Sequence, residues 1–202
     1  MRTAAALLFL AVPLAVQAQM PTEAPGKPNP ALVQPGTYSV DAGHTLVTFK
    51  VNHLGFSEYH GQFGNPTGSL TIDPKKPGEA KVDVSFPIDS VSTTSDGLDK
   101  HLKGADFFDA AKFPAGRFTS TAVKVSGQTA TITGNLTLKG VTKPVTLKAR
   151  FIGAGPSPMG GKLNVGFAAT TTVKRSDFGI SYGIPLVSDN VELTIDAAFV
   201  KE

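Results

Sequence analysis

The chain has 202 residues, which is enough for one domain with a sizeable hydrophobic core. Its 19 basic and 16 acidic residues give a net charge of +3, and the lysines are dispersed instead of forming a stripe, so no nucleic-acid partner is expected. The absence of cysteine excludes a disulfide framework, zinc–thiolate sites, cysteine nucleophiles and a lipid-modified N-terminal cysteine.

Residues 1–18 have the features of a cleaved secretory signal peptide. Arg2 supplies the basic start, an apolar run follows from Ala4 to Val16, and Ala18 provides the small residue of a cleavage site. The run is too short for a membrane anchor, because a spanning helix needs roughly 20 apolar residues. We expect cleavage near Ala18, a periplasmic or secreted protein without a stable membrane anchor, and a remaining charge of +2 from 18 basic and 16 acidic residues.

Residues 19–36 contain five prolines and few apolar side chains. This composition predicts an extended, flexible tether without a packed element. From residue 37 to residue 202 the pattern changes, and these residues are expected to form the folded domain.

Alternating apolar and polar residues, the pattern of a half-buried strand, dominate that domain. Starting with the first clear strand, the residues expected to face inward are Val47, Phe49, Val51 and His53; Leu70 and Ile72; Val82, Val84, Phe86 and Ile88; Phe118, Ser120 and Ala122; Ala130, Ile132, Gly134, Leu136 and Leu138; Val145, Leu147, Ala149 and Phe151; Leu163, Val165, Phe167 and Ala169; and Val191, Leu193, Ile195, Ala197 and Phe199.

With an opening strand near Tyr38 and Val40, the pattern predicts eight or nine antiparallel strands joined by short turns. Each strand has one solvent-exposed face, so the other face must be buried against a second sheet or inside a sheet that closes on itself. We expect an all-β fold, an antiparallel up-and-down β-barrel of about eight strands, because closure removes exposed edges. A jelly roll or a sandwich is the alternative.

One stretch, Ser95–Pro114, has helical periodicity instead. Leu98, His101, Leu102 and Ala105 share one helical face. We interpret this insert as a gate over one end of the barrel, with His101 as its one polar contact and with apolar contacts from Leu98, Leu102, Phe107, Phe108 and Phe113.

The small residues on the inward faces bear on whether the barrel is filled or hollow. They are Ala122, Ala130, Gly134, Ala149, Ala197 and, depending on register, Gly166 or Ala169. Eight strands enclose either a filled interior or room for one small ligand, and small residues favour the second. The alternative is that the 13 phenylalanines fill the space. A hollow interior would be apolar and would suit a long apolar chain whose polar group stays at the mouth.

The polar candidates do not form a reaction centre. No pair among the four histidines has the close spacing of metal ligands, so neither a metal site nor a catalytic residue is expected; these histidines are His44, His53, His60 and His101. Asp106 and Asp109 are expected to terminate local turns. For Arg175 and Asp177 the simplest prediction is a structural ion pair, with a contact from Arg175 to a ligand head group as the alternative.

Four motifs between Tyr38 and Val200 resemble the YceI-like family of bacterial envelope proteins: HTLVTFKVNHLGFSEYHGQF, LDKHLKGADFFDAAKFPAGRFTSTAV, GNLTLKGVTKPVTL and VKRSDFGI. The resemblance implies a lipocalin-like barrel that binds polyisoprenoid chains, quinone-type tails or other long lipids, with no known catalysis. The family residues that it places here are His53, His101-Leu102, Phe107-Phe108-Asp109, Arg175, Asp177, Phe178 and Gly179. Leu98 stands where the family often has arginine, so any ionic contact of that arginine is absent or rerouted.

We therefore expect a non-enzymatic protein that binds or transports a long-chain lipid or isoprenoid, without a cofactor or metal; the sequence also allows a homodimer. The alternatives are a filled structural or stress-protection barrel and a histidine-dependent metal protein or enzyme. The expected ligand-binding residues are Phe49, Val51, His53, Phe63, Phe86, Leu98, His101, Leu102, Phe107, Phe108, Phe113, Leu136, Ala149, Phe167, Arg175 and Phe178.

Overall fold

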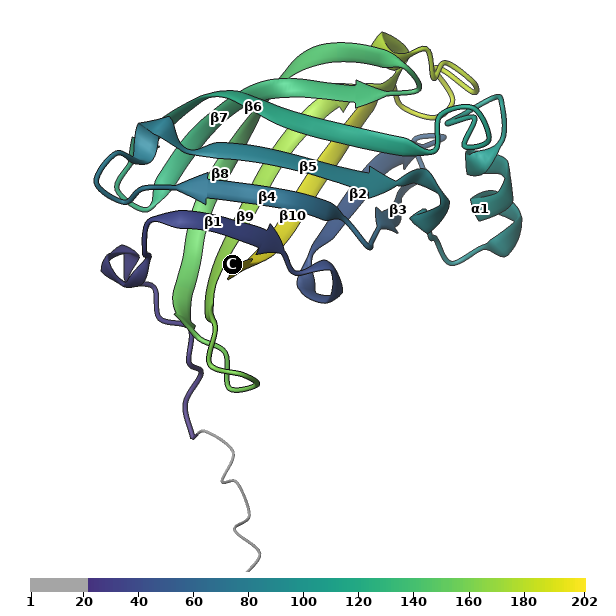
Figure 1. Cartoon of the computed structure of the whole chain (residues 1–202). Helices are drawn as coiled ribbons and strands as arrows, with labels where there is room; N and C mark the ends of the chain where they lie inside the picture. Colours follow the sequence, from purple (N-terminus) through teal and green to yellow (C-terminus); the bar gives the residue numbers. More distant parts are fainter. Residues whose placement is uncertain (1–21) are drawn as a thin grey trace, which may run out of the picture.

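Ten strands form one antiparallel sheet that closes into a barrel (Figure 1). The computed structural model describes residues 22–202, so the expected signal peptide lies outside the described residues. The strands are β1 (Gly36–Val40), β2 (Leu46–His53), β3 (Ser57–Phe63), β4 (Thr67–Ile72), β5 (Lys81–Pro87), β6 (Ala115–Ser126), β7 (Thr129–Leu138), β8 (Val141–Pro156), β9 (Leu163–Lys174) and β10 (Asn190–Lys201). One α-helix, α1 (Asp96–Lys103), and five 3₁₀ turns complete the described part: η1 (Pro30–Leu32), η2 (Ala42–His44), η3 (Pro77–Glu79), η4 (Ile88–Ser90) and η5 (Arg175–Phe178).

Two of the barrel strands are interrupted. β10 pairs along one edge with both β1 and β2, so these two are halves of one strand that η2 breaks. β3 and β4 pair with β2 and β1 in turn, and the break between them contains Asn65, which has a positive φ, and Pro66, which has no N–H to donate. Counted this way, eight strands follow one another around the ring in chain order. The up-and-down barrel is confirmed, and the sandwich and jelly-roll alternatives are wrong.

The helical insert covers the place where the ring is least complete. β3 pairs with β2 along one edge, and its other edge forms the isolated pair of Gln62 with Ser92, three residues before the insert. α1 lies beyond these strands at one end of the barrel (Figure 1). The Ser95 side chain caps the helix by accepting a hydrogen bond from the Leu98 N–H, and Gly104 ends it. The helix is therefore shorter than predicted, and Ala105, expected on its apolar face, is exposed.

A β-bulge changes the inward face of β6. The pairing register with β7 shifts between Ser120 and Ala122, so the alternation reverses beyond this point. Val123 and Val125 then face the interior, while Ala122 is exposed on the outside. The prediction that Ala122 faces inward is wrong, because one extra residue in a strand exchanges its two faces.

The predicted tether contains a packed element. Its residues 25–35, which we call the N-terminal strap, lie against β8: the N–H and C=O of Lys27 both pair with Ala154, at 2.9 Å each. β7 begins at Thr129 opposite Arg150, so the rest of β8 has a free edge on that side, and the strap covers it. The prediction of an unpacked segment is wrong for the strap.

Two clusters of buried side chains lie toward the two ends of the barrel. The strap-side cluster consists of Val33, Tyr38, Leu70, Phe151, Ala154, Val165 and Phe199. The α1-side cluster consists of Phe63, Ile88, Val91, Leu102 and Ala110, with Val47, Phe49, Phe86, Leu98, Phe107 and Phe108 packed against it.

Candidate ligand cavity

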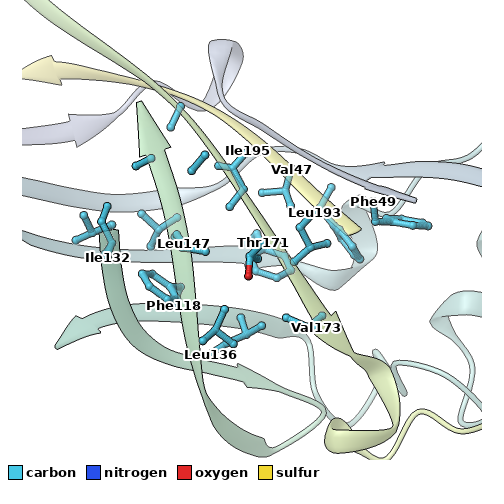
Figure 2. A pocket seen from close by; sticks show the side chains of 18 of the residues that line it. Val47, Phe49, Phe118, Ile132, Leu136, Leu147, Thr171, Val173, Leu193 and Ile195 are labelled. Atoms are coloured by element: carbon cyan, nitrogen blue, oxygen red, sulfur yellow. The ribbon is translucent and has the colours of Figure 1, made fainter. Parts of the chain in front are cut away.

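A cavity of about 1080 Å³ occupies the barrel and touches both buried clusters. Its middle is walled by side chains from facing strands, shown in Figure 2, among them Val47, Leu147 and Leu193. Native interiors normally leave few voids larger than a water molecule, so a cavity of this size has the dimensions of a ligand-binding pocket. The interior is hollow, and the alternative of a filled barrel is wrong.

The predicted alternation places the walls correctly on β8 and β10. Every residue expected to face inward from these two strands lines the cavity: Val145, Leu147, Ala149 and Phe151 from β8, and Val191, Leu193, Ile195, Ala197 and Phe199 from β10. Because the polar residues of each strand point the other way, the lining is dominated by aliphatic and phenyl groups.

Three inward glycines leave room for phenyl rings to lie flat against the wall. A Cβ atom at any of them would overlap the ring of a phenylalanine on the adjacent strand; the pairs are Gly61 with Phe49, Gly116 with Phe86, and Gly134 with Phe118. Small residues thus make room for aromatic rings, as expected if phenylalanine side chains filled the barrel. The rings nevertheless lie along the wall and leave the centre open.

Aromatic and polar groups meet where the α1 insert approaches the loop of residues 180–188. The His101 ring lies 4.9 Å from that of Phe107 and 5.2 Å from that of Tyr182, both edge-on, and Phe107 lies 5.4 Å from Tyr182. We call these three residues the mouth cluster. The His101 Nε2 is 3.5 Å from a carboxylate oxygen of Asp106. His53 and Tyr59 line the same end, so hydrogen-bonding groups gather here.

Arg175 holds the loop of residues 180–188 in place. Its guanidinium is buried and donates to four carbonyl oxygens, at 2.7–3.2 Å, those of Ile180, Tyr182, Val187 and Ser188. Burial lowers the pKa of Arg175, and the charge of Asp189 partly opposes this effect. The predicted ion pair with Asp177 is wrong, because Arg175 directs its N–H groups to backbone carbonyls.

Asp189 fixes the start of η5. Its carboxylate accepts hydrogen bonds from the Ser176 N–H at 2.9 Å and from the Ser176 hydroxyl at 2.7 Å. The backbone N–H of Ser176 is the main reason that the pKa of Asp189 lies below its usual value; the Ser176 hydroxyl, Lys174 and Arg175 lower it further.

Fifteen of the sixteen residues expected to bind ligand line the cavity, and Phe113 does not. The ring of Phe113 packs on the turn at Gly140, and the Lys112 ammonium lies 5.4 Å from its centre. It falls outside because its ring is directed to this turn, whereas Ala110, three residues earlier, is buried in the α1-side cluster. Lining is not binding, so the ligand contacts of the other fifteen stay predictions.

Several lining residues were not predicted. Thr171 and Val173 continue the inward face of β9, where a run of three threonines hides the alternation. The bulge in β6 brings in Val123 and Val125. Loops add further lining residues, which no periodic pattern marks, among them Pro30, Ala31 and Val33 from the strap, Pro74, Pro77 and Ala80 around η3, Gly127 and Gln128 from the turn before β7, and Ile180, Tyr182, Gly183 and Val187 from the loop after η5.

The histidines are distributed between the cavity and the surface. His53 and His101 line the cavity, whereas His44 bonds to Asp41 at 2.8 Å on the surface and His60 is exposed. Within residues 22–202, no group of three or more His, Cys, Asp or Glu side chains is arranged to hold a metal ion. In the same part of the chain, no helix has the length and apolar character needed to cross a membrane.

Comparison with known proteins agrees with this architecture. The YceI-like domain matches residues 38–199. Protein YceI of Salmonella arizonae is 44% identical over 167 residues, covering 82% of this chain and 87% of that protein. In fold, BcnA of Burkholderia cenocepacia is similar with a TM-score of 0.71 at 22% identity, covering 79% of this chain and 98% of that one. A polyisoprenoid binding domain from Saccharophagus degradans gives 0.63 at 15% identity, covering 82% and 98%. The domain match and the identity to protein YceI establish that this chain belongs to the YceI-like family.

Proposed function

We propose that this protein binds the long apolar chain of a lipid, such as a polyisoprenoid, an isoprenoid quinone or a fatty-acid-like molecule, and carries or stores it in the bacterial periplasm. The observation that carries the proposal is the cavity of about 1080 Å³ with its hydrocarbon and phenyl walls. This volume is slightly above the range of ordinary ligand pockets, which is roughly 300–1,000 Å³.

The size and the lining of the cavity together favour a chain over a compact polar molecule. Each methylene group moved from water into such a cavity contributes about 0.8 kcal/mol, so ten would contribute about 8 kcal/mol before the lost freedom of the ligand is subtracted. The central wall of the cavity has few hydroxyl groups, and Thr171 supplies one of them. A polar ligand group placed there would therefore find few hydrogen-bond partners.

The polar end of the ligand is best accommodated near the mouth cluster. His53, Tyr59, His101 and Tyr182 offer hydrogen-bonding atoms at this end of the cavity. Arg175 lines the same end, but four of its five N–H groups already donate to carbonyl oxygens, which leaves little for a head group. We assign the head-group contacts to the mouth cluster and its neighbours.

Other observations support the proposal. One structural neighbour, from Saccharophagus degradans, is a polyisoprenoid binding domain. The family and its structural neighbours point to a binding barrel, and we propose that this protein acts without catalysis and without a cofactor. The features of a cleaved signal peptide in residues 1–18 support the periplasmic location.

Mass spectrometry of an organic extract tests the proposal. Protein purified from the periplasm under native conditions should release an isoprenoid, quinone or fatty acyl compound in near-stoichiometric amount. The matched control is the same protein unfolded in denaturant, washed and refolded without lipid, which should release none. An extract without lipid, together with a refolded protein that takes up no added long-chain alcohol, would overturn the proposal.

A further inference from the structure

The strap lies at the barrel end opposite to α1 (Figure 1). At the α1 end, the turn after β7 contacts the insert: the Lys139 ammonium donates to the Ala105 carbonyl at 2.9 Å. At the other end, the Gln128 side chain, just before β7, donates to the Pro28 carbonyl at 3.0 Å. β7 thus runs from the strap to the insert. Its 10 residues span roughly 34 Å at about 3.4 Å per residue, or about 26 Å along the barrel axis for a usual strand tilt.

The strap is fixed on both sides of η1. Before η1, Lys27 pairs with Ala154 through two backbone hydrogen bonds. After η1, the fully buried Tyr38 donates its hydroxyl to the Gln34 carbonyl at 2.7 Å and accepts from the Gln34 N–H at 3.2 Å. Val33, between these anchors, is buried in the strap-side cluster. η1 is thereby held as an arch between two anchored segments.

The arch forms part of the cavity wall. Pro30, Ala31 and Val33 line the cavity, whereas Leu32 between them does not. Asn29 sets the arch by accepting a hydrogen bond from the Ala31 N–H at 3.0 Å. A chain that enters with its polar end at the mouth cluster would therefore reach Ala31 with its apolar end.

Two glycines of β8 allow the strap to lie this close. A Cβ atom at Gly155 would overlap the carbonyl oxygen of Pro25, and one at Gly153 would lie 3.1 Å from the carbonyl oxygen of Lys27. Any larger residue at position 155 has to displace the strap, because backbone atoms cannot move aside as side chains do. The strap lies outside the stretch that the family domain matches, residues 38–199.

We propose that the strap is the end stop of the cavity: it sets the longest apolar chain that can be fully buried, and Ala31 is the residue that meets the end of that chain. This proposal rests on the proposed function, since it specifies which chains the same cavity accepts. The selectivity for the length of the ligand chain is then determined by η1 and the two β8 glycines. The contacts with the ligand head group, near α1, are separate from it.

The test measures the affinity of the refolded, lipid-free protein for a homologous series of unbranched primary alcohols. Affinity should rise roughly four-fold for each added methylene while the chain still fits, and should reach a plateau at the length that meets the strap. Ala31→Phe puts a ring into the end of the cavity and should move the plateau to shorter alcohols. Gly155→Ala displaces the strap and should move it to longer ones.

Each variant has a matched control. Leu32→Phe adds a ring to the same arch at a residue that does not line the cavity. Gly166→Ala adds a methyl group on neighbouring β9, where the nearest atom would lie 3.7 Å away. Both controls should keep the plateau of the unchanged protein, and thermal unfolding establishes that all four variants fold.

The outcomes separate the end stop from the proposed function. A plateau that moves in opposite directions for Ala31→Phe and Gly155→Ala supports the end stop. Binding with the same plateau in every variant overturns the end stop and leaves lipid binding in place. If the unchanged protein binds no alcohol of any length, the proposed function and the end stop fail together.

Discussion

The phenyl ring of Phe49 lies over Gly61, the residue directly opposite on the neighbouring strand. The inward face of β3 has no side chain at this position, so the ring of β2 covers it and takes the place of that side chain. The same ring lies 5.7 Å from that of Phe63, which belongs to the α1-side cluster. A single missing methyl group therefore decides whether Phe49 lies along the wall or projects into the cavity.

Gly61→Ala should consequently narrow the cavity and destabilise the barrel. The new Cβ atom would overlap the Phe49 ring, which has to turn inward, and over-packing of this kind costs about 1–3 kcal/mol. Urea unfolding measures the loss, and uptake of a long-chain alcohol measures the narrowing. Gly166→Ala is the control, because its methyl group meets no atom within 3.7 Å. Equal stability and equal uptake in the two variants would show that the position of the Phe49 ring does not depend on the missing side chain at Gly61.

Periodicity predicts which residues face inward, but not how the strands are aligned. The alternation around Phe49 identified its face correctly, whereas its partner Gly61 follows from the register of two strands, which a single strand pattern does not contain. The error at Ala122 has the same origin, since a bulge is a local departure from the pattern.

The incorrect predictions for residues outside the strands have a different cause. The strap has no periodic pattern and looks like a linker in composition, yet the free edge of β8 and two glycines give it a packing site. Phe113 lies in the same family motif as Phe107 and Phe108, but its ring packs on the turn at Gly140 and does not line the cavity. In both cases long-range contacts outweigh local composition.

A pair of adjacent alanines on β9 tests whether the ligand occupies the cavity. Ala169 lines the cavity, whereas Ala168 belongs to the outer face of the strand. Ala169→Phe should reduce uptake of a long-chain alcohol at least ten-fold, because the ring takes space that the chain would fill. Ala168→Phe should bind like the unchanged protein. Equal losses in both variants, with both folded by circular dichroism, would argue that the chain binds elsewhere.

The anchor after η1 depends on one hydroxyl group. Tyr38→Phe removes the partner of both the N–H and the C=O of Gln34, and each lost hydrogen bond should cost about 0.5–1.5 kcal/mol, because Gln34 is exposed and water can replace the hydroxyl. Urea unfolding should show this loss. Tyr182→Phe, at a ring that is 55% exposed, should stay within about 0.5 kcal/mol of the unchanged protein. Coinciding unfolding curves for the two variants would mean that the Gln34 contacts do not hold the strap.

Acid should weaken the barrel partly through Asp189. The folded protein holds the pKa of this carboxyl below its usual value, mainly through the Ser176 N–H, so the unfolded chain takes up a proton first as pH falls. The stabilisation is therefore complete above the unfolded value, about 3.9, and is lost as pH falls through the lower folded pKa.

Asp189→Asn removes this ionisation and keeps an acceptor for the Ser176 N–H, so its stability should fall less steeply below about pH 4 than that of the unchanged protein. Ser176→Ala should produce a smaller change in the same direction, because it removes the hydroxyl hydrogen bond at 2.7 Å and leaves the N–H bond in place. Urea unfolding at a series of pH values measures all three proteins. Parallel curves for the unchanged protein and Asp189→Asn would place the acid sensitivity at other carboxyl groups.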